Sequence, residues 1–403
     1  MTAPHVPRTA AELRTAIEEG VLVEGLGFDA KADLGHGPKG NTSLAIDLAA
    51  IAVDGGLIAI GVAEERDGDV RRLVPRPVKI GTYRERVSQV GLSRVDPPIF
   101  TTTIELTPEG EDEKGYLLVL VPPSPDAPHM VDGKYRGRSD TTNVVLGDAD
   151  VRRIQSQRRR DYTDIATDLE RAVARDPTPP ATRKHAHLFV VGRPVVTTGP
   201  AMLQDRLGHG WQKWILEDLI PPLSLRMYAP DLGNATNLQR RPDGWAAIIG
   251  YLTPDRQVTQ DDIEDNLLEL EIDEDGALRL FCGRASDSTM SSNVRWAFEV
   301  MLAGLTWGVL RAAATVAEKT DHFGNWNFGV GLTNARGIAS HAANQRALWA
   351  DPYPYGADEF RATTQATFAE LQANRAGVID RLLGRLNRAL NDDSILLPDF
   401  DAQ

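Results

Sequence analysis

The sequence predicts an α/β N-terminal module, with a mixed sheet and helices, followed by an α+β C-terminal domain. Three observations support this fold class. A length of 403 residues exceeds what one hydrophobic core usually holds, which favours two domains. A well-capped helix and a buried strand follow each other closely near the N-terminus. All seven tryptophans lie between Trp211 and Trp349, so the second half of the chain has a different composition.

The clearest elements of the N-terminal module are this helix and strand. Residues 44–52 are helix-forming with an apolar face, residues 41–43 offer N-cap oxygens, and Gly55 and Gly56 end the helix. Residues 57–62 are too short for another helix and apolar on both faces, which indicates a central strand covered on both sides. The other elements predicted here are a short helix after Thr9, an acidic polar turn at 63–69, a helix at 83–92, a hairpin of strands at 99–106 and 116–121, and a helix from Gly147 to Arg175.

A proline-rich segment separates the two parts of the chain. The run from Asp176 to Pro180 cannot continue a helix and forms a stiff spacer, so we place the module at 1–175, the linker at 176–184 and the second domain at 185–403. The elements predicted in the second domain are strands at 187–196, 244–252, 267–272, 277–282 and 326–332 and helices at 211–219, 294–319 and 357–390. The helix at 294–319 is apolar nearly all round and is expected at the centre of its domain.

Charge and composition limit the classes of function. The formal net charge of −13 argues against a broad surface that coats nucleic acid, but it leaves room for a local basic groove. Residues 1–185 hold 25 Lys and Arg against 29 Asp and Glu, so a polyanion site is expected in this half of the chain. A single cysteine, Cys282, excludes an internal disulfide and favours a cytoplasmic protein. Without an apolar run of ~18 to 20 residues or a signal peptide, we expect no membrane contact.

Carboxylates and a lysine gather at the ends of the predicted strands. Asp29 and Lys31 are two residues apart, so on a strand they project from the same face. Glu24 reaches that face only through a bulge or turn, for which the neighbouring glycines provide backbone freedom. Glu64 comes directly after the next predicted strand. Oxygen ligands suit Mg²⁺ or Mn²⁺, which predicts Glu24, Asp29 and Glu64 as metal ligands and Lys31 as a catalytic cation beside a phosphate. The alternative is that these acids are exposed residues at strand ends.

The order of these segments resembles the Schlafen-type AlbA-like domain over residues 15–155. The shared pattern is an acid, Asp29-Ala30-Lys31, a polar gap, an amphipathic helix, Gly-Gly, an apolar strand, Gly-Val with acids, and later a Tyr-x-Arg strand with a Ser/Thr turn. This chain has Asp29-Ala30-Lys31 where E-F-K is usual, Val53 where an asparagine is usual, and Gly61-Val62-Ala63-Glu64 where G-V-D-D is usual. In nuclease members, acids at these places bind a divalent metal and cut RNA, whereas many bacterial members are described only as DNA-binding.

Three groups of residues are predicted to contact nucleic acid. Lys39 lies in the loop at 35–40, whose glycines leave backbone N–H groups free to approach an anion. A tyrosine-arginine strand can stack on bases and clamp phosphates, and an arginine run in the following helix is the densest basic stretch of the chain. The residues concerned are Tyr135, Arg136, Arg138, Arg158, Arg159 and Arg160. The alternatives are a flexible loop, local ion pairs of the strand arginines, and a solvated helix face.

These features predict a nucleic-acid-binding protein, with RNA as the ligand ahead of DNA. The finer hypothesis is a metal-dependent endonuclease that acts on tRNA or another structured RNA in a defence or stress role. The alternatives are a non-catalytic DNA-binding regulator and a module that binds other proteins. Asp29-Ala30-Lys31 favours the enzyme, Ala63 in place of an acid favours the regulator, and the net charge of −13 favours the interaction module.

A homodimer is also expected. Family members with a ring-shaped or horseshoe-shaped groove build it from two related lobes, and this chain carries one recognisable lobe. Two copies of the chain would supply the second lobe, and closed two-fold dimers are the commonest soluble assembly. The predicted interface is in the second domain, at Trp211, Trp214 and the apolar stripe of the helix at 357–390. The alternative is that this stripe packs inside its own domain.

Overall fold

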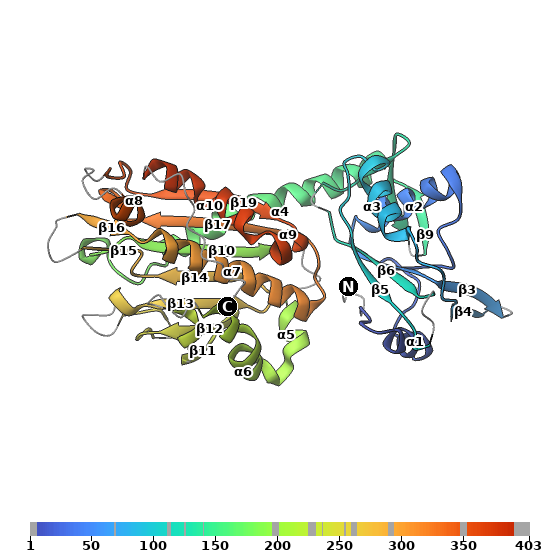
Figure 1. Cartoon of the computed structure of the whole chain (residues 1–403), viewed down its shortest axis with the longest axis horizontal. Coiled ribbons are helices and arrows are strands. Elements are labelled where there is room, and N and C mark those ends of the chain that lie inside the picture. The colour runs from blue at the N-terminus through green and yellow to red at the C-terminus, as the bar shows by residue number, and fades with distance from the viewer. Residues whose placement is uncertain are drawn as a thin grey trace. The chain divides into compact units, whose positions relative to one another are not determined.

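A computed structural model places two compact units in the chain (Figure 1). Unit 1 comprises Met1–Tyr162 and Asp321–Asn325, and unit 2 comprises Thr163–Thr320 and Trp326–Gln403. The structure describes residues 6–67, 70–110, 114–124, 126–139, 141–195, 201–224, 231–235, 237–253, 255–258, 264–288, 294–346 and 353–390, without the side chains of 66, 67, 70, 159–164 and 346. The fold class is confirmed, because unit 1 is α/β with a mixed sheet and unit 2 is α+β.

Unit 1 is built around a four-stranded sheet in the order β1-β2-β6-β5, in which only the β1–β2 pair is parallel. Its helices are α1 (Ala10–Glu18), α2 (Gly37–Ile51), α3 (Tyr83–Ser93) and the first part of α4 (Asp148–Ala174). Its strands are β1 (Phe28–Lys31), β2 (Gly56–Ile60), β3 (Val62–Asp67), β4 (Val70–Pro75), β5 (Thr102–Leu106), β6 (Tyr116–Val121), β7 (Met130–Val131), β8 (Lys134–Ser139) and β9 (Thr142–Val145).

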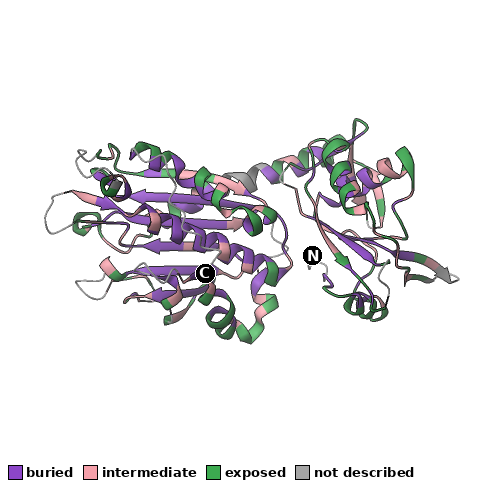
Figure 2. Cartoon of the chain, in the orientation of Figure 1, coloured by how far each residue is buried: buried purple, intermediate pink, exposed green. Residues whose placement is uncertain are grey.

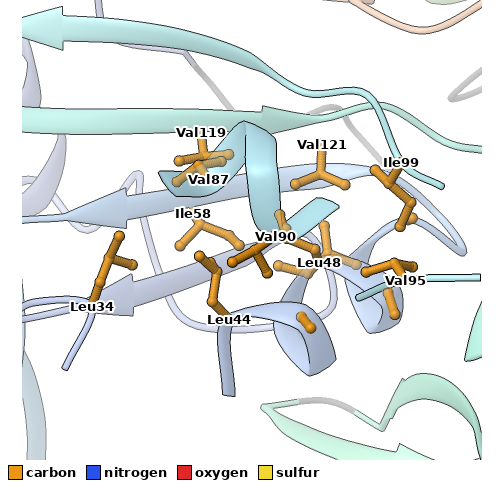
Figure 3. Close-up of a cluster of buried hydrophobic side chains, with 14 of the residues drawn as sticks. Leu34, Leu44, Leu48, Ile58, Val87, Val90, Val95, Ile99, Val119 and Val121 are labelled. Atoms are coloured by element: carbon orange, nitrogen blue, oxygen red, sulfur yellow. The ribbon is translucent and has the colours of Figure 1, made fainter. Parts of the chain in front are cut away.

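The core of unit 1 lies between this sheet and helices α2 and α3 (Figure 3). Leu44 and Leu48 of α2 pack with Val87 and Val90 of α3 in one buried cluster, which includes Ile58 of β2. All four residues 57–60 of β2 have no exposed surface. The prediction of a central strand covered on both sides is therefore confirmed.

Two local predictions in unit 1 are corrected. Helix α2 begins at Gly37 and not after the predicted cap at 41–43, because Pro38 suits the first helical turn. Residues 63–67 of the segment predicted as an acidic turn at 63–69 belong instead to a strand, β3, which pairs antiparallel with β4, and residues 68 and 69 lie outside the described residues. Gly61, with a φ of +94°, separates β2 from β3 and lets the chain change direction there.

Unit 2 is built around a seven-stranded antiparallel sheet in the order β11-β12-β13-β14-β10-β17-β19. Its strands are β10 (His187–Pro194), β11 (Asn237–Arg241), β12 (Gly244–Ile249), β13 (Leu268–Asp273), β14 (Leu278–Cys282), β15 (Ser286–Ser288), β16 (Arg295–Ala297), β17 (Trp326–Thr333), β18 (Ile338–Ser340) and β19 (Phe360–Ala366). Its longer helices are α5 (Met202–Leu207), α6 (Trp211–Trp214), α7 (Glu299–Thr320), α8 (His341–Arg346), α9 (Phe368–Ala373) and α10 (Arg375–Ala389), with short 3-10 turns and one π turn between them.

The central helix predicted for the second domain is α7, and its residues are almost all buried (Figure 2). It packs on β10 and β14, while Leu169 of α4 packs with Phe189 and Val191 of β10. By length and composition α7 resembles a membrane-spanning helix, but 83% of its most apolar window is buried inside the protein. Burial of this kind is ordinary for the core helix of a domain.

Two predictions about domain organisation are corrected. The division between the units falls at Tyr162 and Thr163, inside α4, and not at 176–184. Asp176 belongs to unit 2, where its side chain is 1% exposed and lies 2.7 Å from His187 Nδ1 and 3.1 Å from Arg183 Nη2. These contacts anchor the proline-rich segment, so it is part of the folded unit.

The segment at 357–390 is not one helix. It contains the strand β19 and the helices α9 and α10. The apolar residues of α10 are buried within unit 2, where α10 contacts β19, α7 and α9. Trp214 is also buried, and Trp211 stacks on Trp245 with ring centroids 5.7 Å apart. The apolar stripe of α10 thus packs inside unit 2, as the alternative held, and Trp214 is buried there too, while Trp211 is half-buried.

Candidate functional site

Strand β1 places Asp29 and Lys31 on one face, as their spacing predicts. The backbone of β1 lies close to β2, because the Leu57 N–H donates to the Gly27 carbonyl at 2.9 Å and Gly56 leaves room for that carbonyl. The Lys31 ammonium lies 3.0 Å from Asp29 Oδ2. Asp29 is 6% exposed, so this contact is largely shielded from water.

Residues from three other elements complete the cluster. The Lys31 ammonium also lies 3.1 Å from Oδ2 of Asp47, which comes from α2. Arg138 of β8 donates to Asp29 Oδ1 at 2.9 Å, and Asn143 of β9 donates to Asp47 Oδ1 at 2.6 Å. We call Asp29, Lys31, Asp47, Arg138 and Asn143 the ion-pair cluster. It joins β1, α2, β8 and β9 through charged and polar contacts.

Burial and charge shift the ionisation of this cluster. Burial raises the pKa of Asp47, and the nearby Asp29 raises it further, while Lys31 and Asn143 oppose the shift. Burial alone would lower the pKa of Lys31, but Asp47 and Asp29 outweigh it and the pKa is raised. Lys31 therefore stays protonated at neutral pH and serves as a fixed cation.

Glu24 and Glu64, the other two predicted metal ligands, lie near this cluster. Glu24 Oε1 accepts a hydrogen bond from the Ala30 N–H at 3.3 Å. Partial burial raises the pKa of Glu24, and the charges of Glu64 and Asp29 raise it further. Glu64 Oε1 faces Arg71 Nη1 at 3.2 Å on the β3–β4 hairpin. Glu24 thus lies close enough to Glu64 and to Asp29 for their charges to raise its pKa.

This arrangement does not fit a divalent cation. A magnesium or manganese ion needs carboxylate oxygens that are free to bind it. Both oxygens of Asp29 already face cations, one at Arg138 and one at Lys31. Among the residues that the structure describes, no group of three acid, histidine or cysteine side chains is assembled to hold a metal. The cluster is a charge-balanced set of ion pairs.

The start of α2 has a different character. The N-cap residue is His36, which makes no side-chain cap hydrogen bond, and the first turn contains no acid. Lys39 is exposed in that turn. The first N–H groups of a helix have no partner within the helix, so an uncapped start attracts anions.

A half-buried guanidinium lies beside this helix start. Arg86 of α3 donates to the Gly35 carbonyl at 2.7 Å and to Asn41 Oδ1 at 2.7 Å. Arg86 Nη2 lies so close to Gly40 that a Cβ atom added at position 40 would be 2.8 Å from this nitrogen. Arg86 thus holds Gly35 and the beginning of α2 in place and adds a fixed positive charge beside them.

Among the other residues predicted to contact nucleic acid, Arg138 and Arg158 make contacts inside unit 1. Arg158 is 8% exposed and donates to the Val53 carbonyl after the end of α2, so its charge is used inside the unit. Tyr135 and Arg136 of β8 are half-buried, and Arg138 belongs to the ion-pair cluster. The side chains of Arg159 and Arg160 lie outside the described residues.

Sequence reasoning missed Asp47, Asn143 and Arg86. Asp47 carried a usable signal, because an acid between Ile46 and Leu48 on an apolar helix is buried only with a partner. No comparable signal marks Asn143 or Arg86, because polar side chains at such positions are ordinarily exposed. Their roles depend on contacts over 96 and 51 residues of sequence.

Comparisons with known proteins find few similarities. No protein family matches the sequence, and no curated protein matches it. One solved structure, the N-terminal domain of a "Putative ATP-dependent DNA Helicase RecG-related Protein" from Nitrosomonas europaea, is 22% identical, with a TM-score of 0.24, over 35% of this chain and 97% of that domain. The DIP2311 protein of Corynebacterium diphtheriae is 17% identical, with a TM-score of 0.22, over 32% of this chain and 23% of its own. At these TM-scores neither similarity bears on function.

Proposed function

We propose that unit 1 binds nucleic acid through the phosphate backbone, RNA ahead of DNA, and that it does not cleave its ligand. The start of α2 supports this most, because uncapped N–H groups, the exposed Lys39 and the guanidinium of Arg86 lie together there. Phosphates bind readily at helix N-termini, where the free N–H groups and the helix dipole both favour an anion. The resemblance of the sequence to Schlafen-type AlbA-like domains supports the same class of ligand, and the preference for RNA depends on that resemblance alone.

The ion-pair cluster has a positioning role in this proposal. Lys31 and Arg138 hold α2 and β8 against β1 through Asp47 and Asp29. The orientation of α2 relative to the sheet therefore depends on the cluster. The ion pairs of Asp29 give no support to a cleavage step through a bound metal.

The test is binding of a fluorescein-labelled RNA hairpin, and of DNA of the same sequence, followed by fluorescence anisotropy at 50 and 200 mM salt. We expect binding that weakens with salt, because displaced counterions drive phosphate contacts. Lys39→Gln should weaken binding several-fold. It should also reduce the slope of log binding constant against log salt concentration by about 1, as loss of one phosphate contact does. Lys114→Gln removes an exposed lysine two residues before β6 and is the matched control, which should leave binding unchanged.

Three results would count against the proposal. If neither the salt concentration nor Lys39→Gln changes the affinity, phosphate recognition at the start of α2 is rejected. No binding to either nucleic acid would favour the protein-interaction module. RNA cleavage in the presence of Mn²⁺, retained in Lys39→Gln and lost in Asp29→Asn, would overturn the non-catalytic part and restore the endonuclease hypothesis.

A further inference from the structure

Unit 2 contains a cleft with a cavity volume of about 620 Å³, a size that suits a small organic ligand. Arg175, Arg241 and Arg256 line it, together with Asp176, Asp255, Gln257 and Val258. The rings of the prolines that line the cleft add apolar surface to its wall. Three guanidiniums thus converge on one opening that also has apolar and neutral polar surface.

Buried carboxylates hold these guanidiniums in place. Glu269 of β13, which is 1% exposed, accepts from Arg241 Nη2 at 2.5 Å and from Arg256 Nε at 2.8 Å. Glu271, two residues further along β13, accepts both Nη atoms of Arg175 at 2.9 and 2.8 Å. The side chains of Arg241 and Arg256 are 6% and 9% exposed. A ligand would therefore meet arginines whose orientation is already fixed, and little ordering would oppose binding.

Arg256 also has an unusual backbone. Its φ is +62°, in the left-handed region that favours glycine. A turn holds it there, because the Arg256 N–H donates to the Thr253 carbonyl at 2.8 Å and the Gln257 N–H donates to Thr253 Oγ1 at 2.8 Å. Backbone strain of this kind concentrates at functional sites.

The Arg256 side chain retains donor capacity at the cleft. Its Nε binds Glu269 and its Nη1 binds the Arg175 carbonyl, while Nη2 has no partner among the residues that the structure describes. A buried guanidinium with an unused N–H group favours an acceptor from a ligand.

We propose that this cleft binds a small phosphorylated organic molecule. A phosphate presents at least three acceptor oxygens, which matches three guanidiniums better than a single carboxylate does. The prolines and Val258 suit an apolar or flat organic body, and Asp255 and Gln257 suit its hydroxyl or amine groups. In this network four arginines, Arg175, Arg241, Arg256 and Arg279, share the three carboxylates of Glu269, Glu271 and Asp273. The cleft wall also holds two other acids: Asp176 pairs with Arg183 and His187, and Asp255 accepts from Thr253 Oγ1. The proposal is independent of nucleic-acid binding by unit 1.

The experiment uses the full chain and isothermal titration at low salt with four probes: inorganic phosphate, AMP, adenosine and citrate. We expect AMP to bind most tightly, inorganic phosphate more weakly, and adenosine not at all. Arg175→Gln should weaken AMP about tenfold or more, because it removes a charged donor while Glu271 keeps Arg279 as a partner. The double variant Arg256→Gln with Glu269→Gln should have the same effect and leaves the net charge unchanged.

Two control variants separate this site from others. Arg336→Gln removes an exposed guanidinium of unit 2 that pairs with Asp358 and does not line the cleft, so AMP binding should be unchanged. Lys39→Gln in unit 1 should also leave it unchanged. Each variant is checked by far-UV circular dichroism and by its unfolding midpoint, and if the double variant does not fold, Arg175→Gln decides the question.

Four results would overturn the proposal. The first is that neither AMP nor phosphate binds, and the second is that adenosine binds as tightly as AMP. The third is that citrate binds more tightly than phosphate, and the fourth is that the cleft variants do not weaken AMP binding. Loss of AMP binding in Lys39→Gln alone would transfer the ligand to unit 1 and also reject the cleft.

Discussion

At the scale of single residues, Asp47 decides what the candidate site is. A site made of Glu24, Asp29 and Glu64 alone would be acidic and suited to a cation. Asp47 instead draws Lys31 between two carboxylates, and Arg138 takes the other oxygen of Asp29. The charges then balance inside the protein, so the cluster stabilises the fold and positions α2.

The contribution of these ion pairs can be measured with Lys31→Met. This change leaves Asp47 and Asp29 buried beside an uncharged side chain, and removal of one partner from a buried pair is strongly destabilising. Because the Lys31 side chain is 29% exposed, we expect a loss of about 2 kcal/mol in the free energy of unfolding, below the ~3 to 5 of fully buried pairs. Urea unfolding followed by far-UV circular dichroism gives the value.

Two further variants control this measurement. Lys39→Met, at an exposed lysine of the same unit, should change the free energy of unfolding by about 0.5 kcal/mol or less. Lys31→Met with Asp47→Leu should recover part of the loss, because an apolar pair avoids the unpaired charge. Equal effects of Lys31→Met and Lys39→Met would mean that the ion pairs contribute nothing measurable.

At the scale of elements, the segment at 357–390 shows how local signals compete. Its amphipathic pattern predicts a long helix, but residues 360–366 hold threonines and pair along β17 as strand β19. Thr367 and Glu370 then form a capping box, which marks the true start of α9. Asn374 accepts from the Gly377 N–H and starts α10. The caps were present in the sequence, while the strand before them depended on β17 as a partner.

The capping box at the start of α9 has a predictable contribution. Thr367→Ala removes the oxygen that accepts from the Glu370 N–H at 3.1 Å, so we expect a loss of about 1 kcal/mol in the stability of unit 2. Thr367→Ser keeps a cap oxygen, so its free energy of unfolding should be close to that of the parent protein. Urea unfolding followed by tryptophan fluorescence measures both variants. If serine and alanine destabilise equally, the packing of the Thr367 methyl group and not the cap is responsible.

At the scale of the whole molecule, the two units can be observed separately. All seven tryptophans lie in unit 2, so tryptophan fluorescence follows the unfolding of that unit alone. The homodimer stays a prediction from the single recognisable lobe, because the interface argued from the sequence is buried within unit 2. Sedimentation velocity of the full chain at micromolar concentration tests it, and a monomer would reject it.

Unit 2 should lose stability as the pH rises from 6.5. His187 has no exposed surface and lies 2.7 Å from Asp176 Oδ2 and 2.9 Å from Glu264 Oε1. Burial alone would lower the pKa of His187, but its hydrogen bonds to Asp176 and Glu264 raise it above 6.5. The folded protein therefore keeps a proton that the unfolded chain releases, and the stabilisation is complete below pH 6.5 and is lost as pH rises through the folded pKa.

Urea unfolding followed by tryptophan fluorescence between pH 6 and 8.5 measures this effect. In the parent protein the free energy of unfolding should fall across this range. In His187→Gln it should be lower at pH 6 and nearly independent of pH above it, because the titrating group is absent. A slope that persists in His187→Gln would assign the pH dependence to another group.

The sequence alone determined the parts of this protein that depend on near neighbours along the chain. Apolar runs and their lengths identified β2, β6 and the central helix α7, and the order of these elements identified two units of different class. The same reasoning placed Asp29 and Lys31 on one face, because side-chain direction in a strand alternates with a fixed period.

Only the tertiary structure decided the partners of the charged residues and the division between the units. Arg138 reaches Asp29 from 109 residues away, and Arg175 reaches Glu271 from 96 residues away. The sequence specifies which positions carry a charge. Whether a charged side chain faces water, a metal or an opposite charge depends on which distant elements pack beside it. Asp176 shows this at the predicted linker, because its contacts with His187 and Arg183 make a proline-rich segment part of a folded unit.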